Sequence, residues 1–281
     1  MRALALLLFA APAFAQTPDP YDVLTQATLD ANPAKRVAVL ASMGVIRPEP
    51  KPVALVEGML ADKDYGTRQA ACSTLGEMKS RASIPKLKEA LDDKAPEVVF
   101  AAARALYNMG DPAGRNVLIA VLEGDRANSS GLVASSMRDA KVKLHDPKAL
   151  LLIGVNESAG LLGPFGVSVP IAEMIMKDKE ASGKTAATLL LSTDTTQESK
   201  EAIKEALSDK NWTVRVAAAR AVATRDMHPF YDDVAALLTD KRDEVRYEAA
   251  SAMIRLKQSG PKPAKSPAPQ SHKPGPSAQG Q

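Results

Sequence analysis

Apolar residues in the C-terminal part of the chain recur every three or four positions. Val214, Ala217, Ala218, Ala221 and Val222 stand at i, i+3, i+4, i+7 and i+8, the spacing that places side chains on one face of an α-helix. After a turn signal at residues 226–229, a second stripe of the same kind follows, made of Phe230, Val234, Leu237 and Leu238. The pattern therefore predicts a helix, a tight turn and a second helix.

This unit is repeated along the chain. Equivalent residues lie 31 positions apart: Asp209 and Asp240, Val214 and Val245, Arg215 and Arg246, Ala218 and Ala249, Ala221 and Ala252. Residues 62–92 and 93–123 keep the same period. One helix pair cannot bury both of its stripes alone, so neighbouring units must stack. We therefore expect an all-α fold, an α-solenoid of stacked helix–turn–helix units wound into a right-handed superhelix.

The repeated motif, an aspartate followed by Val-Arg and two spaced alanines, resembles the HEAT repeat, in the short variety also found in phycobilisome-lyase-like proteins. The resemblance covers about residues 31–256. In such relatives the aspartate and arginine form a ladder between neighbouring units, which implies the same for Asp209 with Arg215 and for Asp240 with Arg246. Val99 stands where the unit at 93 should carry its arginine, so we expect the ladder to be interrupted there.

The two ends of the chain differ from the repeats. A basic residue, an apolar run and Ala13-Phe14-Ala15 make residues 1–15 a bacterial-type signal peptide cleaved after Ala15, which predicts export to the periplasm or medium. The run is too short to span a bilayer, so no transmembrane segment is expected in the mature chain. The predicted domains are a leader or first helix at 16–30, the solenoid at 31–258 with an apolar insertion at about 145–168, and a disordered Pro/Lys-rich tail at 259–281.

Charge and cysteine content narrow the choice of partners. The chain carries a net charge of +3, and removal of Arg2 and of the tail residues Lys262, Lys265 and Lys273 leaves a body of −1. With only 4% aromatic residues, such a body lacks the basic footprint and stacking groups of a nucleic-acid binder. The single cysteine, Cys72, has no intramolecular disulfide partner and stands in an alanine-rich stripe typical of a buried position.

Two short motifs are too incomplete to predict catalysis or a cofactor. Gly183-Lys184-Thr185 resembles the end of a phosphate-binding loop, but Asp178 stands where the first glycine is needed and a helical pattern precedes it. Ser158 resembles a nucleophile elbow, but Asn156 replaces the glycine two positions before it. We therefore predict no catalytic residue and no cofactor.

The other polar candidates also have structural interpretations. His145 and His228 lack a second ligand three or four positions away, so no metal site is predicted. The acidic pairs occur at helix termini, where carboxylates cap helices and complement the helix dipole. These pairs are Asp92-Asp93 and Asp232-Asp233.

The remaining candidates are surfaces. In arrays of this kind the second helices are expected to form the inner, binding face, and their outward positions include Lys86, Lys200 and Lys204. The insertion offers a second candidate, because apolar residues in a Gly/Pro loop can anchor a partner. These anchors are Leu161, Leu162 and Phe165. The alternative is that this loop folds back and fills the groove.

The preferred hypothesis is an exported, non-catalytic scaffold or adaptor that binds a protein through the solenoid groove and the loop at 154–168. One alternative is an enzyme or enzyme subunit of the lyase-like HEAT group, which handles a chromophore or modifies a residue. Another is an envelope-tethered structural protein whose basic tail makes weak contact with an anionic surface.

Overall fold

The computed structural model describes residues 17–123 and 179–260, and within these ranges the regular structure is helical. The N-terminal range contains α1 (Pro20–Thr28), α2 (Pro33–Met43), α3 (Pro50–Gly58), α4 (Tyr65–Glu77), α5 (Ile84–Glu89), α6 (Pro96–Asn108) and α7 (Pro112–Glu123). The C-terminal range contains α11 (Lys179–Leu191), α12 (Gln197–Ala206), α13 (Trp212–Thr224), α14 (Tyr231–Ala236) and α15 (Asp243–Ser259). Short 3₁₀ turns extend several of the second helices. They are η1 (Met59–Ala61), η2 (Arg81–Ser83), η3 (Ala90–Asp92), η7 (His228–Phe230) and η8 (Leu237–Thr239).

Local sequence chemistry sets where the helices begin. Asp64 caps α4 by accepting the Thr67 amide at 2.8 Å, and Asn211 caps α13 by accepting the Thr213 amide at 3.0 Å. Prolines occupy the first turn of α1, α2, α3 and α6, where the missing amide proton is not needed. At the end of α6, Gly110 adopts a φ of +80°, which suits the residue that closes a helix.

Neighbouring helices approach closely wherever the sequence supplies small residues. A Cβ added to Gly76 of α4 would lie 2.8 Å from the Ala105 Cβ of α6. A Cβ on Gly114 of α7 would lie 2.4 Å from the Ala103 carbonyl oxygen and 2.4 Å from the Tyr107 amide nitrogen. The α6–α7 pair therefore touches backbone to backbone at Gly114.

Gly114→Ala is expected to lower the free energy of unfolding by about 1–3 kcal/mol, because the new methyl group can be accommodated only by separating α6 from α7. Gly58→Ala, at the end of α3, is the matched control, since a Cβ there meets nothing within 4 Å. Chemical denaturation followed by circular dichroism measures both variants. Equal effects of the two substitutions would contradict the close approach.

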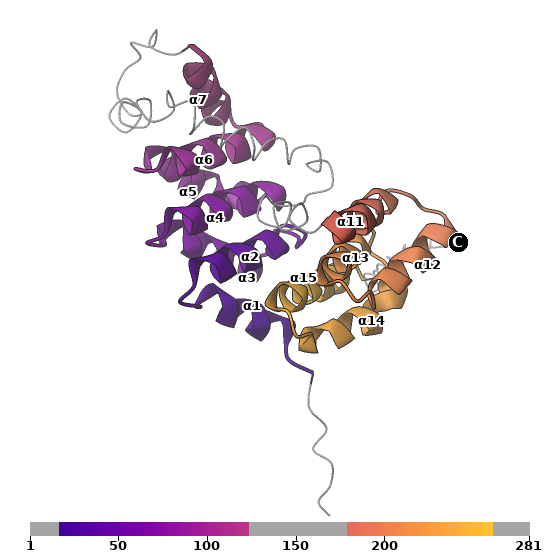
Figure 1. Cartoon of the computed structure of the whole chain (residues 1–281). Helices are drawn as coiled ribbons and strands as arrows, with labels where there is room; N and C mark the ends of the chain where they lie inside the picture. Colours follow the sequence, from indigo (N-terminus) through magenta and orange to yellow (C-terminus); the bar gives the residue numbers. More distant parts are fainter. Residues whose placement is uncertain (1–16, 124–178, 261–281) are drawn as a thin grey trace, which may run out of the picture.

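We call α1 to α7 the N-terminal array and α11 to α15 the C-terminal array. The end of the C-terminal array packs against the beginning of the N-terminal array, so the order of the helices in space differs from their order in the sequence. Helix α15 packs against α13 on one side and against α2 on the other, so the first helices follow one another in space as α11, α13, α15, α2, α4 and α6 (Figure 1). Helix α1 packs against α15 and takes the place of the second helix of that last unit. Residues 16–30, expected as a leader or first helix ahead of the array, therefore contain the helix that completes the C-terminal unit.

One hydrophobic core runs through both arrays. Met43, Leu75 and Leu106 are fully buried at equivalent positions of α2, α4 and α6, and Leu24 of α1 is buried in the same core cluster as Leu256 of α15. Alanine is the commonest residue at the other buried positions of the first helices. Because the small side chain of alanine permits a short distance between helix axes, the first helices can approach more closely than the second helices.

The stack consequently bends toward its first helices. Arg220 of α13 reaches past α15 to the Ala41 carbonyl of α2 and to Glu77 of α4, a span that is possible only on the inner side of a bend. Figure 1 shows α12 and α14 on the side of α13 and α15 that faces away from α2 and α4. The expectation that the second helices form the inner face is therefore wrong for the described residues.

Candidate functional site on the inner side of the bend

An ion-pair ladder connects successive units along one edge of the stack. Arg68 binds Asp93 of the next unit through two hydrogen bonds of 2.7 and 2.9 Å, and Arg36 binds Asp62 at 2.8 Å. Each arginine also donates to a backbone carbonyl at the start of its own unit. The Arg68 guanidinium holds the pKa of the Asp93 carboxyl below its ordinary value even though partial burial opposes this. This edge ties the units together.

In the C-terminal array the partners in this ladder differ from those implied by the resemblance. Arg215 binds Asp240 of the next unit at 2.8 and 2.9 Å, while it contacts Asp209 only through the Asp209 backbone carbonyl, at 2.7 Å. The Asp209 carboxylate accepts instead from Lys184 of the preceding unit, at 2.9 Å. Arg246 pairs with Asp243 and donates to the Asp240 carbonyl. The partners differ because the arginine side chain of a first helix extends toward the turn of the next unit, as Arg215 of α13 does toward Asp240.

The inner side of the bend carries a second, more buried charged group. Arg220 donates from Nη1 to both Glu248 carboxylate oxygens, at 3.1 and 3.2 Å, and its Nη2 lies 3.7 Å from the Glu77 Oε2. We call Glu77, Arg220 and Glu248 the bend cluster. Glu248 and Arg220 are 0% and 2% exposed, and the Glu77 side chain keeps 30% of its surface in solvent. The cluster thus extends from the core to the inner surface.

Burial raises the pKa of the Glu248 carboxyl to about 7, because desolvation outweighs the attraction of Arg220. Burial also raises the pKa of Glu77, whose carboxylate is surrounded by protein on the inner side of the bend although part of the side chain is open. The negative charge of Glu77 adds to the rise in the pKa of Glu248. One arginine is therefore shared by two carboxyl groups that resist ionisation.

The bend cluster departs from the repeat that surrounds it. Glu248 follows the ladder arginine position by two residues, and every other aligned unit of the described chain has alanine there. These alanines are Ala38, Ala70, Ala101, Ala186 and Ala217. Neither Glu248 nor Arg220 was predicted from the sequence. For Glu248, the available signal was a charged residue at a position that is alanine in the other units.

The neighbouring unit continues the polar inner side. Arg104 of α6 lies in the same repeat position as Arg220, and its Nη2 donates to the Ser73 Oγ of α4 at 3.4 Å. The positive charge of Arg104 lowers the pKa of Glu77, opposing the effect of burial. Glu77 therefore lies between two arginines, one buried and one partly exposed.

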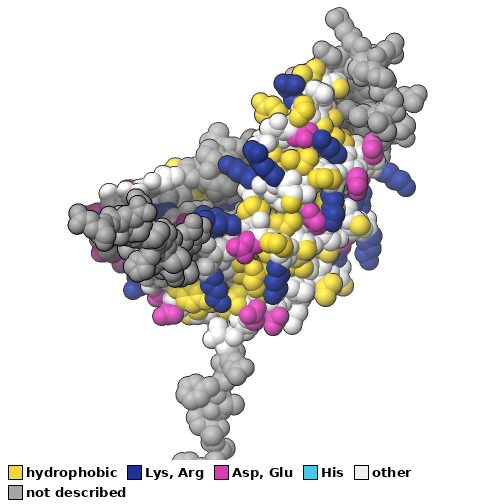
Figure 2. Space-filling model, turned by 180° about the vertical axis from the view of Figure 1, so that it is seen from behind, with side chains coloured by type: hydrophobic (Ala, Val, Ile, Leu, Met, Phe, Trp, Pro, Cys, Tyr) yellow, Lys and Arg dark blue, Asp and Glu magenta, His cyan; other side chains and the backbone are white. Residues whose placement is uncertain are grey.

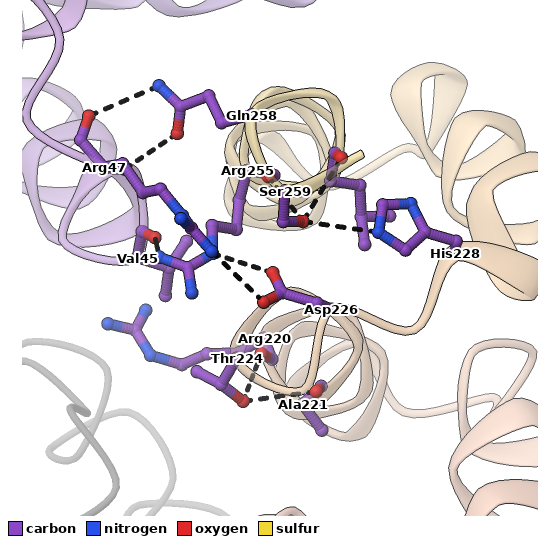
Figure 3. A network of polar contacts seen from close by, with 11 residues as sticks. Val45, Arg47, Arg220, Ala221, Thr224, Asp226, His228, Arg255, Gln258 and Ser259 are labelled. Atoms are coloured by element: carbon purple, nitrogen blue, oxygen red, sulfur yellow. Dashed lines mark hydrogen bonds and ion pairs between the residues drawn. The ribbon is translucent and has the colours of Figure 1, made fainter. Parts of the chain in front are cut away.

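The turns beside the α15–α2 joint form a further polar network, which Figure 3 draws together with Arg220. Arg255 donates to Asp226 at 2.9 Å, and Arg47 approaches the same carboxylate at 3.4 Å. The Gln258 side chain accepts from the Arg47 amide at 2.8 Å. These contacts connect the end of α15 and the α13–α14 turn to the turn after α2. They fasten the two arrays together.

The same network contains a serine–histidine pair. Ser259 Oγ lies 3.4 Å from His228 Nε2, but Ser259 also donates back to the carbonyl oxygens of α15. The Asp226 carboxylate binds arginines and is not the group that orients His228. Such an arrangement is a helix-end contact and lacks the base–orienter geometry of a hydrolase triad.

The other sequence-predicted residues lie apart from the bend cluster. Lys86 of α5 pairs with Glu57 at 2.7 Å, and the Lys204 ammonium lies 5.8 Å from the Phe230 ring centre. All three predicted lysines belong to second helices, Lys86 to α5 and Lys200 and Lys204 to α12. Figure 2 shows charges of both signs mixed with apolar side chains over the rear face. Leu161, Leu162, Phe165, His145 and Ser158 lie outside the described residues.

The phosphate-loop-like triplet and the acidic pairs serve the fold. Lys184 and Thr185 belong to the interior of α11, where Thr185 shares a hydrogen bond of 2.9 Å with Thr213. Asp93 is a ladder residue, and Asp232 and Asp233 lie in the first turn of α14.

No set of three or more potential metal ligands occurs in residues 17–123 and 179–260. No helix in that part of the chain is long and apolar enough to cross a bilayer.

Comparison with known proteins agrees with the repeat geometry. A search of curated proteins found no match to the chain. A family model for HEAT repeats matches residues 52–130 and 169–254, which include the described helices from α4 to α7 and from α11 to α14. HEAT repeats suggest a helical scaffold for protein interaction. Because the match covers more than half of the sequence, the chain belongs to the HEAT-repeat family.

Proposed function

We propose that the protein is an exported, non-catalytic scaffold that binds a protein partner on the inner side of its bend. The observation that carries this proposal is the open end of the bend cluster. Glu77 and Arg104 present opposite charges on adjacent helices, α4 and α6, and each is held by a neighbouring group. A fixed pair of opposite charges orients a polypeptide by complementary contacts and disfavours wrongly aligned partners.

The architecture supports a scaffold role through its continuity. Helices α11, α13, α15, α2, α4 and α6 form one curved row although they come from two separate parts of the chain. Ladder pairs fasten the row along one edge, and the Asp226 network fastens the joint at the turns. A rigid curved surface presents binding residues at low entropic cost.

The absence of catalysis is part of the proposal. Cys72, the chain's single cysteine, is fully buried, and desolvation raises the pKa of its thiol to about 12, which keeps it in the unreactive thiol form at neutral pH. Export is inferred from the signal-peptide pattern of residues 1–15. Within this proposal, the apolar loop at 154–168 and the basic tail contribute additional contacts to the partner or to the envelope surface.

Site-specific photocrosslinking tests the proposed face. A photoreactive amino acid at position 73, beside Arg104, is expected to crosslink a protein from the envelope, whereas the same group at position 86 in α5 is expected to crosslink weakly or not at all. Position 165 tests the apolar loop. Arg104→Glu is expected to reduce the crosslink from position 73 by at least about tenfold, the effect of losing roughly 1.4 kcal/mol.

Lys210→Glu provides the matched control, because Lys210 is an exposed lysine in the turn before α13. Strong crosslinks from position 86 with none from position 73 would place the partner on the second helices and reject the inner face. A mature N-terminus other than Gln16 in the periplasmic or secreted fraction, or recovery of the protein only with an intact leader, would contradict export.

A further inference from the structure

We propose that the bend cluster is a proton-controlled joint, which holds the two helical arrays together on the inner side when one of its carboxyl groups is protonated and loosens when both are ionised. The inference concerns regulation and does not depend on which partner binds. It rests on the position of the cluster, on its charge balance and on its departure from the repeat.

The position of the cluster makes it a brace between the arrays. Arg220 belongs to the C-terminal array, whereas Glu77 and the Ala41 carbonyl belong to the N-terminal array. Glu248 is on α15, the helix that lies between them. Contacts from Arg220 to α2 and α4 therefore close the inner side of the joint, and any opening of the bend must break them.

The groups that face Glu248 determine its response to pH. Arg220 faces Glu248 from α13, and Glu77 faces it from α4. Helix α2 adds only uncharged groups: the Ala41 carbonyl, which accepts from Arg220, and Ser42, which shares a hydrogen bond of 3.1 Å with Ser251 of α15. Among the described residues, α1 and α14 add no ionisable group that shifts the pKa of Glu248. Arg104 acts on Glu77 from α6.

Charge balance sets the direction of the change. With Glu248 protonated, Arg220 is free to balance Glu77, and the link between α13 and α4 is favourable. With Glu248 ionised, Arg220 is engaged by the closer carboxylate, at 3.1 Å, and Glu77 at 3.7 Å loses its counter-charge while it is repelled by Glu248. Glu77 can relieve this repulsion because part of its side chain already reaches solvent. The expected movement is an opening of the inner side as pH rises.

The chain's own repeats show that the fold does not need these charges. The other aligned units have alanine at the Glu248 position, and the ladder and core are built without it. A buried carboxyl group is costly unless it is paired or neutral. Among the described units, this carboxyl group occurs only in the one that joins the two arrays, at Glu248. Control of that joint would explain why it occurs there.

Distance measurement between spin labels tests the joint in the full mature chain. Labels are attached at Glu89→Cys in α5 and Glu205→Cys in α12, both exposed outer positions, while buried Cys72 stays unlabelled. We expect the most populated distance to shift between pH 6 and pH 8, with a midpoint near the pKa of Glu248, about 7. In Glu248→Gln and in Glu248→Ala, which restores the alanine of the other units, we expect the pH 6 distance at both pH values.

Glu198→Gln is the control, because Glu198 is an exposed carboxyl group in the first turn of α12 and should leave the shift intact. An unchanged distance in the wild-type chain between pH 6 and pH 8 would overturn the proposal, whatever the variants do. A shift that persists in both Glu248 variants would assign it to other groups and would also overturn it.

Stability provides an independent readout with a defined sign. The folded-state pKa of Glu248 is raised, so its favourable contribution is complete below the ordinary carboxyl pKa and is lost as pH rises through about 7. The melting temperature of Glu248→Gln minus that of the wild type is therefore expected to increase from pH 5.5 to pH 8. A constant difference over that interval would show that Glu248 does not titrate in the folded protein.

Discussion

Arg220→Met is expected to lower the free energy of unfolding at pH 8 by about 3–5 kcal/mol, the cost of breaking a buried ion pair from one side. Arg220 is 2% exposed and is the counter-charge for fully buried Glu248. At pH 6 the loss should be smaller, because Glu248 is then largely protonated and its partner's removal leaves no unpaired buried charge. Chemical denaturation at the two pH values measures this difference.

The double variant Arg220→Met, Glu248→Leu separates the charge effect from packing. Replacing a whole buried ion pair with apolar residues of similar size is often neutral or stabilising, so the second substitution should recover most of the loss at pH 8. If the double variant remains as unstable as the single one, Arg220 stabilises the joint through its contacts with the Ala41 carbonyl and Glu77 more than through Glu248.

Leu24→Ala in α1 is expected to cost about 2–5 kcal/mol, the range for removing a fully buried leucine side chain. Leu24 is 0% exposed in the core, and α1 packs against α15 as well as α2. The loss of stability should therefore extend to α15, at the opposite end of the described sequence. Hydrogen exchange is expected to accelerate in α14 and α15 as well as in α1.

Leu29→Ala is the matched control, because Leu29 directly follows the same helix and is 76% exposed. It should change the free energy of unfolding by no more than about 0.5 kcal/mol. Faster exchange confined to α1 and α2 in the Leu24 variant would mean that α1 does not complete the C-terminal unit.

Much of the fold was predictable because its determinants are local. The stripe from Val214 to Val222 and the equivalent residues 31 positions later depend only on helix geometry, and the structure places α13 and α15 there. The repeat motif also indicated the family, which the match to HEAT repeats confirms. The pairing within the ladder was harder to predict. The resemblance indicated the correct residue types, but the contact of Arg215 with Asp240 of the next unit depends on how the units stack.

The candidate site could not be predicted in the same way. Glu77, Arg220 and Glu248 belong to three separate helices, and Arg220 lies 143 positions after Glu77 in the printed sequence. No spacing rule connects them. The inner face was also assigned to the wrong helices, because the direction of bending depends on which row of helices packs more closely.

The amino-acid sequence by itself determined that this protein consists of paired helices in HEAT-type units, since a 3.6-residue apolar period and a 31-residue repeat act within and between adjacent units. Only the tertiary structure decided how the two arrays join. Helix α15 at one end, and α1 and α2 at the other, each have an apolar face that their own array does not cover. These faces are buried against one another, which brings α15 beside α1 and α2. That joint creates the bend cluster, which neither array contains alone.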